Sequence, residues 1–241
     1  MNKFVCGDSR CVLQDVDDET IHLIITSPPY NVGKEYELDS TLETWRALLQ
    51  DVFKECYRVL IPGGRICVNI ANTWRKPYLP LHRYVMEILE NSGFSMMRGE
   101  IIWDKGASVG TSTAWGSWKR ASNPVLRDVH EYILIYSKGK WGREPGKSTI
   151  TRDEFLECTK SIWRISTASS KETGHPASFP LELPSRLIKL YSYEGDVVLD
   201  PFAGTGNTCI AAKQLERYFI GIEKVEEYVE KARERIFSAR S

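Results

Sequence analysis

The chain has 241 residues, of which 42% are hydrophobic and 27% are charged, and its 32 basic residues are balanced by 32 acidic residues. This composition excludes a largely disordered chain and a collagen-like repeat, and it is typical of a globular protein with one sizeable core. A net charge of zero also excludes a strongly basic protein that coats nucleic acid without specificity.

The N-terminal residues contain no apolar segment of the kind found in a secretory signal peptide, and apolar runs such as 21–25 are too short to span a bilayer. The six cysteines are scattered, with no CxxC pair and no histidine cluster, so no metal site is predicted. We therefore expect a cytoplasmic protein with reduced cysteines and no contact with a membrane.

Short apolar runs alternate with helical patterns along the chain, which is typical of βαβ units and a mostly parallel sheet. The expected strands are Phe4–Cys6, Ile21–Thr26, Gly64–Ile70, Gly99–Asp104, Glu131–Ser137, Asp196–Leu199 and Tyr218–Ile222. The expected helices are Leu42–Leu60, Leu79–Asn91, Leu183–Tyr191, Gly206–Leu215 and Lys224–Phe237. Two stretches, 106–128 and 139–174, have no clear period, and long irregular segments inside a compact domain usually have a function.

The first motif with chemical meaning follows the expected strand Ile21–Thr26. It reads Ser27-Pro28-Pro29-Tyr30. Two prolines at the carboxyl end of a strand fix a rigid corner whose carbonyl groups can accept hydrogen bonds from a ligand, and Tyr30 offers a flat ring for stacking. A turn that serves only packing is the alternative interpretation of these residues.

The second motif, Asp200–Thr208, follows the expected strand Asp196–Leu199 and opens a helix. A glycine-rich turn between a strand and a helix lets a ligand approach the backbone and the helix N-terminus, which favours an anionic group. About 20 residues later, the expected strand Tyr218–Ile222 is followed by Glu223, which could accept hydrogen bonds from a ribose. A nicotinamide cofactor fits less well, because Cys209 stands where a dinucleotide motif has its third glycine.

Together the two motifs resemble those of DNA amino-methyltransferases, in the permuted (β) group whose catalytic corner precedes the cofactor turn. That family's corner is (Asp/Asn/Ser)-Pro-Pro-(Tyr/Phe), matched by Ser27–Tyr30, and its cofactor turn is Asp-Pro-Phe-x-Gly-(Ser/Thr)-Gly, matched by Asp200–Gly206. Further similarities cover Cys6–Asp8, Leu60–Gly64, His130–Lys138 and His175–Pro180, so that only about 139–174 is unmatched.

The resemblance implies a Rossmann-like α/β fold with a mostly parallel seven-stranded sheet, an antiparallel hairpin at its edge and a circularly permuted order. It divides one methyltransferase domain into a catalytic part (1–138), a small target-recognition insertion (139–174) and a cofactor-binding part (175–241). A monomer or a homodimer is expected, and the sequence leaves open whether a companion restriction endonuclease exists.

The resemblance also implies S-adenosylmethionine as the methyl donor. By position, Glu223 would bind the ribose, Asp8 the adenine amino group, and Phe202 would pack against the cofactor, over which Phe179 and Pro180 would close. Asp200 would either contact the cofactor or orient the turn. The amides that would hold the methionine end belong to Gly204, Thr205, Gly206, Asn207 and Thr208.

The acceptor implied by the corner is an exocyclic amino group of a base that has been flipped out of double-stranded DNA. Ser27 and the carbonyl of Pro28 would accept hydrogen bonds from the amino hydrogens, Pro29 would complete the corner, and Tyr30 would stack on the base. Direct in-line transfer would need no covalent intermediate, because alignment of the two reactants supplies much of the catalysis. A serine at the first corner position goes with cytosine N4 in this family.

Other functions remain open from the sequence. The acceptor could instead be adenine N6 in DNA or RNA, or a protein glutamine, since all use the same corner. A DNA- or nucleotide-binding module without chemistry is a second alternative, and a nicotinamide oxidoreductase is a distant third.

Basic residues with nearby tryptophans mark where DNA is expected to bind, because phosphates require positive charge and base edges require long polar side chains. One group lies in the expected insertion and a second could form an opposite wall, although either could be a solvated loop. The two groups are Lys140, Arg143, Lys147 and Arg152, and Trp118, Lys119, Arg120 and Arg127.

Overall fold

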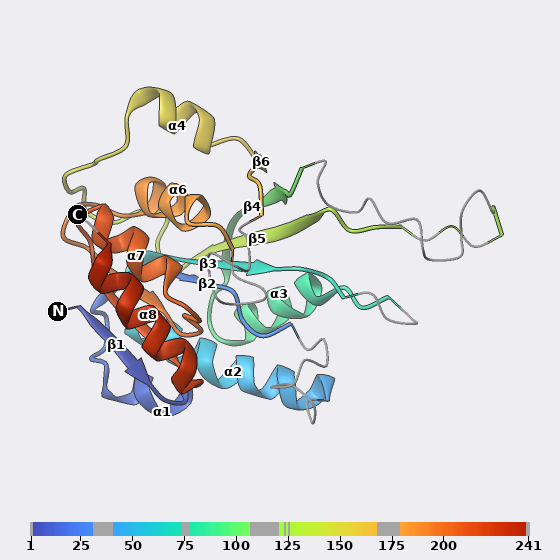
Figure 1. Cartoon of the computed structure of the whole chain (residues 1–241), viewed down its shortest axis with the longest axis horizontal. Helices are drawn as coiled ribbons and strands as arrows, with labels where there is room; N and C mark the ends of the chain where they lie inside the picture. Colours follow the sequence, from blue (N-terminus) through green and yellow to red (C-terminus); the bar gives the residue numbers. More distant parts are fainter. Residues whose placement is uncertain are drawn as a thin grey trace.

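The computed structural model describes residues 2–30, 41–73, 78–106, 121–122, 124, 126–167 and 179–239. Its centre is an eight-stranded sheet of order β1-β8-β7-β2-β3-β5-β4-β6, in which β5 alone runs antiparallel to its neighbours (Figure 1). The strands are β1 (Lys3–Cys6), β2 (Ile21–Thr26), β3 (Leu60–Ile70), β4 (Met96–Asp104), β5 (His130–Ser137), β6 (Ile162–Arg164), β7 (Val197–Asp200) and β8 (Tyr218–Glu223).

Helices cover both faces of the sheet, so the central strands are buried on both sides and consist of continuous apolar runs. Figure 1 shows α2 and α3 below the sheet and α4 and α6 above it. The helices are α1 (Ser9–Val12), α2 (Leu42–Val59), α3 (Leu81–Asn91), α4 (Arg152–Cys158), α6 (Glu182–Tyr191), α7 (Asn207–Gln214) and α8 (Glu226–Ser238), with a 3₁₀ turn at Leu13–Asp15.

Two apolar cores result, one on each face. The α2/α3 face buries Trp45 and Phe53 of α2 against the sheet, and the opposite face buries Leu187 of α6 and Ala211 of α7. The helical period expected for 42–60 is therefore the stripe with which α2 contacts the sheet, as an amphipathic surface helix requires. Among the described residues, no helix combines the length and the apolar character that crossing a membrane requires.

The strand order reverses between β7 and β2, which are neighbours in the sheet: the strand that follows each of them in sequence lies on the side away from the other. Leu23 pairs with Val198 and Ile24 with Leu199, whereas β3 follows on the far side of β2 and β8 on the far side of β7. In open α/β sheets, ligands bind in the crevice at such a switch point, outside the carboxyl ends of the strands. The two predicted motifs follow these two strands directly.

The sheet has eight strands and not the seven that were expected. The additional strand, β6, pairs in parallel with β4 at the sheet edge and belongs to the expected insertion 139–174. It escapes prediction because it has three residues, of which only Trp163 is buried, at 1% exposure. The helices α1 and α4 also escape, with four and seven residues. Every expected strand and helix is present, Ile21–Thr26 with the expected bounds and the others with shifts at their ends.

Candidate active site

The corner after β2 is attached to β7 of the sheet and to helix α2. Thr26 Oγ1 donates to Asp200 Oδ1 at 2.8 Å, and Trp45 Nε1 in α2 donates to the carbonyl oxygen of Pro29 at 2.6 Å. The Pro29 carbonyl is therefore committed to the protein. The first contact joins the corner to the glycine turn, so the structure brings the two predicted motifs together at the carboxyl ends of β2 and β7, where an open α/β sheet is expected to have its ligand crevice.

Asp200 orients the glycine turn from inside the protein. Its side chain is buried at 1% exposure and accepts hydrogen bonds from Thr26 Oγ1, from Thr208 Oγ1 at 2.7 Å and from the Phe202 amide at 3.1 Å. Burial raises the pKa of Asp200 to about 6, although the three hydrogen bonds act in the opposite direction. Of the two roles considered for Asp200, these contacts fit the orientation of the turn.

The turn ends at Gly206, which caps the N-terminus of α7 in a left-handed conformation with φ of +85°. The backbone angle favours glycine here, and a Cβ atom would also make a tight contact, 3.2 Å from Ala232 Cβ. Because glycine has no side chain to cap a helix, the amides of the first turn of α7 face the crevice without a side-chain acceptor from their own cap. That arrangement suits an anionic group such as a carboxylate.

Glu223 closes the other side of the turn, at the end of β8. Its Oε2 accepts from the Gly204 amide at 2.9 Å and its Oε1 from the Val225 amide at 2.8 Å. Both oxygens are thereby oriented while they keep lone pairs for a ligand. A carboxylate beside a helix N-terminus fits a nucleoside that bears a carboxylate, with its ribose diol on Glu223.

Asp8 lies beside Glu223, because Cys6 of β1 pairs with Glu223 of β8. Its carboxylate caps α1 by accepting from the Arg10 amide, and it binds the Arg10 guanidinium at 2.7 Å. The hydrogen bond from Arg10 lowers the pKa of Asp8, with burial opposing. Asp8 is thus at the edge of the crevice, and its contact with an adenine amino group stays a prediction.

Other residues predicted to bind the cofactor hold the turn together. Arg235 of α8 donates to Thr205 Oγ1 at 3.0 Å and to Asn207 Oδ1 at 2.6 Å, and Asn207 Nδ2 donates to the carbonyl of Phe179 at 2.7 Å. The segment Phe179–Pro180 is therefore fastened to the start of α7. Phe202 packs partly buried against the core on the α2/α3 face.

A polar network missed by the sequence analysis lies behind the corner. Tyr30 Oη is 2.8 Å from Ser27 Oγ, donates to Glu131 Oε2 at 2.9 Å and accepts from Asn69 Nδ2 at 2.9 Å. Asn69 Nδ2 also donates to Glu131 Oε2 at 2.6 Å, and Lys105 Nζ lies 2.5 Å from Glu131 Oε1. The network crosses from β2 over β3 and β5 to the end of β4.

Burial and the charge of Glu131 raise the pKa of Tyr30 well above the ordinary tyrosine value, so its hydroxyl is neutral. The polar residues Asn69 in β3 and Glu131 in β5, each next to an apolar run, are the signal of this network in the sequence. Both are buried, at 2% and 7% exposure.

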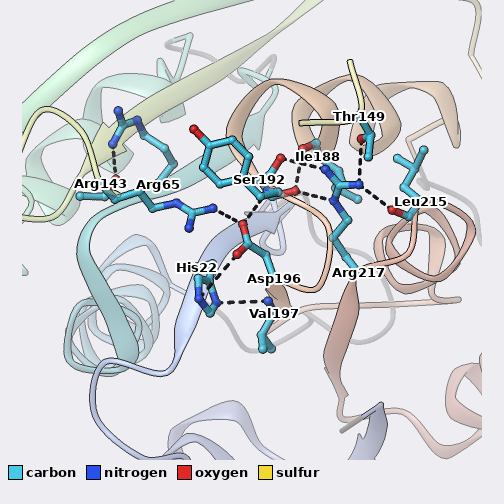
Figure 2. A network of polar contacts seen from close by, with 12 residues as sticks. His22, Arg65, Arg143, Thr149, Ile188, Ser192, Asp196, Val197, Leu215 and Arg217 are labelled. Carbon is cyan, nitrogen blue, oxygen red and sulfur yellow. Dashed lines mark hydrogen bonds and ion pairs between the residues drawn. The ribbon is translucent and has the colours of Figure 1, made fainter. Parts of the chain in front are cut away.

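The basic residues within 139–152 that were expected to bind DNA lie apart from the crevice. Figure 2 shows Arg143 directed at Asp196, which precedes β7 and also contacts His22 near the start of β2. Lys147 pairs with Glu194, and the carbonyl of Trp141, beside Lys140, accepts from Arg65 of β3, which pairs with Leu23 near the start of β2. These groups lie at the amino ends of the strands, opposite the corner, and the structure does not bring them together with it.

The remaining basic residues are placed differently. Arg152 begins α4, and Glu154 of α4 binds Lys189 at the end of α6, also far from the corner. Arg127 is exposed and precedes β5, whose first residues lie at the carboxyl ends of β3 and β4. Trp118, Lys119 and Arg120 lie outside the described residues.

The chain is similar to known DNA methylases in sequence and in fold. The family model N6_N4_Mtase, described as DNA methylase, matches residues 21–234. The chain is 34% identical to type II methyltransferase M.MjaI of Methanocaldococcus jannaschii, over 92% of this chain and 86% of the relative.

Solved structures agree. TTHA0409, a candidate DNA modification methylase from Thermus thermophilus complexed with S-adenosyl-L-methionine, is similar with a TM-score of 0.79 and 31% identity, over 98% of this chain and 93% of that chain. The cytosine-N4-specific PvuII DNA methyltransferase shares the fold, with a TM-score of 0.76 and 23% identity over 99% and 90% of the two chains.

Proposed function

This chain belongs to the N6/N4 family of DNA methylases, and we propose that it transfers a methyl group from S-adenosylmethionine to the exocyclic N4 amino group of a flipped-out cytosine in double-stranded DNA. The observation that carries the proposal is the 2.8 Å hydrogen bond between Thr26 and Asp200, which holds the acceptor corner and the donor turn on one crevice. Two reactants bound at these two sites would be neighbours, and such alignment removes much of the entropic barrier to transfer.

The residues at the turn fit the methyl donor. Glu223 would accept hydrogen bonds from the ribose hydroxyls, and the amides at the start of α7 would bind the carboxylate of the methionine end. When bound, S-adenosylmethionine supplies an electrophilic methyl group on its sulfonium. Phe179 and Pro180 would lie against the same site, because Asn207 holds the Phe179 carbonyl near the helix N-terminus.

The corner would hold the acceptor nitrogen and prepare it for attack. The lone pair of an exocyclic amino group is delocalised into the base, so the nitrogen is a weak nucleophile. Ser27 Oγ and the Pro28 carbonyl would accept the two amino hydrogens and favour a pyramidal nitrogen with its lone pair directed at the methyl group. Their dipoles also stabilise the positive charge that develops on nitrogen.

Cytosine is proposed as the target because a neutral serine begins the corner, as in the cytosine-N4 members that this sequence resembles. Adenine N6 is the alternative acceptor, since a hydroxyl can accept a hydrogen bond from either amino group. Stacking on Tyr30 would offset part of the cost of unstacking the base, which is a few kcal/mol.

DNA would approach from the carboxyl ends of the strands, where the corner opens. We propose a contact from Arg127, which precedes β5 where that strand meets the carboxyl ends of β3 and β4. Contacts from Trp118, Lys119 and Arg120 stay a prediction. The target-recognition role of 139–174 stays a prediction: its described part crosses from the amino ends and reaches the carboxyl ends at Arg164, which is bound to Asp104. A companion restriction endonuclease likewise stays a prediction.

Incubation of the protein with plasmid DNA and S-adenosylmethionine that carries a labelled methyl group tests the proposal. We expect label in DNA, N4-methylcytosine among the digested nucleosides, and one short sequence context when the modified positions are sequenced. N6-methyladenine would correct the acceptor, and no transfer to DNA of any sequence would leave a binding module without chemistry.

The role of Glu223 makes a separate prediction. In Glu223→Gln, an amide NH₂ would face either the Gly204 or the Val225 amide, and the ribose would lose a charged acceptor. Hydrogen bonds to charged groups contribute about 1.5–3 kcal/mol, so we expect S-adenosylmethionine to bind roughly 10–100-fold more weakly in calorimetric titration. Glu227→Gln, in an exposed pair with Lys231, is the matched control; equal affinity of both variants would remove Glu223 from the donor site.

A further inference from the structure

We propose that the buried Lys105–Glu131 pair fixes the direction of the hydroxyl hydrogens in the Ser27–Tyr30 chain, so that Ser27 presents only lone pairs to the target base. The pair would thereby select an amino group and reject a carbonyl group at the methylated position. This inference rests on the proposed function, because it concerns how the same corner recognises its acceptor.

The first step is the state of Glu131. Lys105 Nζ lies 2.5 Å from Oε1, and Asn69 Nδ2 donates to Oε2 at 2.6 Å, so Glu131 is a carboxylate in an ion pair and accepts hydrogen bonds at both oxygens. An ionised carboxylate accepts hydrogen bonds and cannot donate. Tyr30, which is 2.9 Å from Oε2, must therefore be the donor in that contact.

The orientation of Asn69 agrees with this assignment. Its Oδ1 has no hydrogen-bond partner among the described residues, whereas its Nδ2 contacts both Glu131 and Tyr30. The reversed amide would place an oxygen against the Glu131 carboxylate, which is repulsive. Asn69 therefore donates to Tyr30 Oη as well, and occupies one of its two lone pairs.

The second step follows from the count of hydrogens on Tyr30. Its one hydroxyl hydrogen is directed at Glu131, so the contact of 2.8 Å with Ser27 Oγ requires Ser27 to be the donor. The Ser27 hydrogen then points into the protein, and the lone pairs of Ser27 are left for the crevice. An amino N–H can donate to these lone pairs, whereas a base carbonyl at the same place would meet oxygen against oxygen.

Lys105 and Glu131 are thus positioning residues that act through Tyr30 and do not contact the base themselves. Lys105 pairs with Oε1 of Glu131, while Oε2 of the same carboxylate faces Tyr30. A glutamine in place of Glu131 could donate to Tyr30 and reverse both hydroxyls. Ser27 would then offer a hydrogen to the crevice and lose its preference for an amine.

The test measures how strongly the wild-type protein and the Glu131→Gln variant each prefer one of two DNA duplexes over the other. Both carry the site mapped by sequencing, one with the amino base at the target position and one with its deaminated counterpart, uracil for cytosine or hypoxanthine for adenine. Each target base stands opposite an abasic position, so neither has to break a base pair. Affinities are measured by fluorescence anisotropy with S-adenosylhomocysteine present, so that no reaction takes place.

We expect wild-type protein to bind the amino duplex at least about 10-fold more tightly than the carbonyl duplex, and Glu131→Gln to reduce this ratio to near one. A general loss of structure would weaken binding to both duplexes equally and leave the ratio of the two affinities unchanged. Tyr30→Phe, which removes the link while it keeps the ring, is expected to lower the ratio in the same way. Lys138→Met is the control, because Lys138 is a buried lysine that pairs with the exposed Glu19 at the opposite end of β5, and it should keep the wild-type ratio.

If the wild-type protein methylates DNA and the Glu131→Gln and Tyr30→Phe variants keep its ratio of affinities for the amino and carbonyl duplexes, the inference is overturned and the proposed function stays intact. A wild-type protein that transfers no methyl group to DNA would overturn the proposed function, and this inference with it.

Discussion

Replacement of Ser27 by alanine is expected to lower kcat for DNA methylation by about 10²–10³-fold, with the affinity for S-adenosylmethionine unchanged. This loss corresponds to roughly 2.7–4 kcal/mol, the effect of removing one oriented hydrogen-bonding group from the place where charge develops in a transition state. Single-turnover rates with saturating DNA and calorimetric titration of the donor would measure the two quantities.

The donor site should survive this change because it is joined to the corner through a different residue. The contact to Asp200 comes from Thr26, and the Pro29 carbonyl is held by Trp45, so neither depends on the Ser27 hydroxyl. Ser185→Ala is a suitable control, since its hydroxyl donates to a carbonyl within α6. A Ser27→Ala rate within about threefold of the wild-type rate would exclude Ser27 as an essential acceptor.

The second large effect is expected at Asp200. Asp200→Ala would leave the hydroxyls of Thr26 and Thr208 and the Phe202 amide without their acceptor in a buried place, and each such loss costs about 1–3 kcal/mol. We expect the free energy of unfolding to fall by roughly 3–5 kcal/mol, and binding of the donor to fail with it. Asp200→Asn keeps the shape and is expected to keep most of the stability at neutral pH.

The pH dependence of stability distinguishes the two side chains. The pKa of Asp200 is about 6 in the folded protein and about 3.9 in an unfolded chain, so the folded state binds the extra proton between these values. The stabilising effect of that proton is complete below about pH 4 and is lost as the pH rises through 6, which lowers wild-type stability by about 3 kcal/mol.

Asparagine does not titrate, so the difference in unfolding free energy between wild type and Asp200→Asn should shift by about 3 kcal/mol in favour of the variant between pH 4 and pH 7. Urea denaturation at unit steps of pH measures this difference. A difference that stays constant over that range would mean that Asp200 is already ionised at pH 4 in the folded protein.

The amino-acid pattern is enough to locate the crevice, because each motif is contiguous and follows a strand with an unmistakable apolar run. Val197–Leu199 before Asp200 and Ile21–Ile25 before Thr26 are such runs. The parallel arrangement then requires both carboxyl ends to lie on the same side of the sheet. Glu223 is predictable for the same reason, since it ends the next strand.

What the pattern does not predict depends on contacts between distant strands. Asn69 and Glu131 are 62 positions apart, and only the pairing of β3 with β5 brings them together. The charge of Arg143 is visible in the sequence, but its pairing with Asp196 is not, so a residue that fastens a loop to the sheet looks the same as one awaiting a phosphate. The edge strand β6 is short and carries a single buried side chain, so it shows no alternation of apolar and polar residues that could predict it.

The neighbours of the crevice come from opposite ends of the chain: Leu23 pairs with Val198, and Lys3 with Ile220. Pairings of such sequence separation must close very large loops before they gain any contact, and they slow folding. During synthesis, the half that carries Ser27 emerges long before β7 exists to hold it. The enzyme should therefore become active only when β7 and β8 enter the sheet. A nascent chain that lacks these two strands should not be able to methylate DNA.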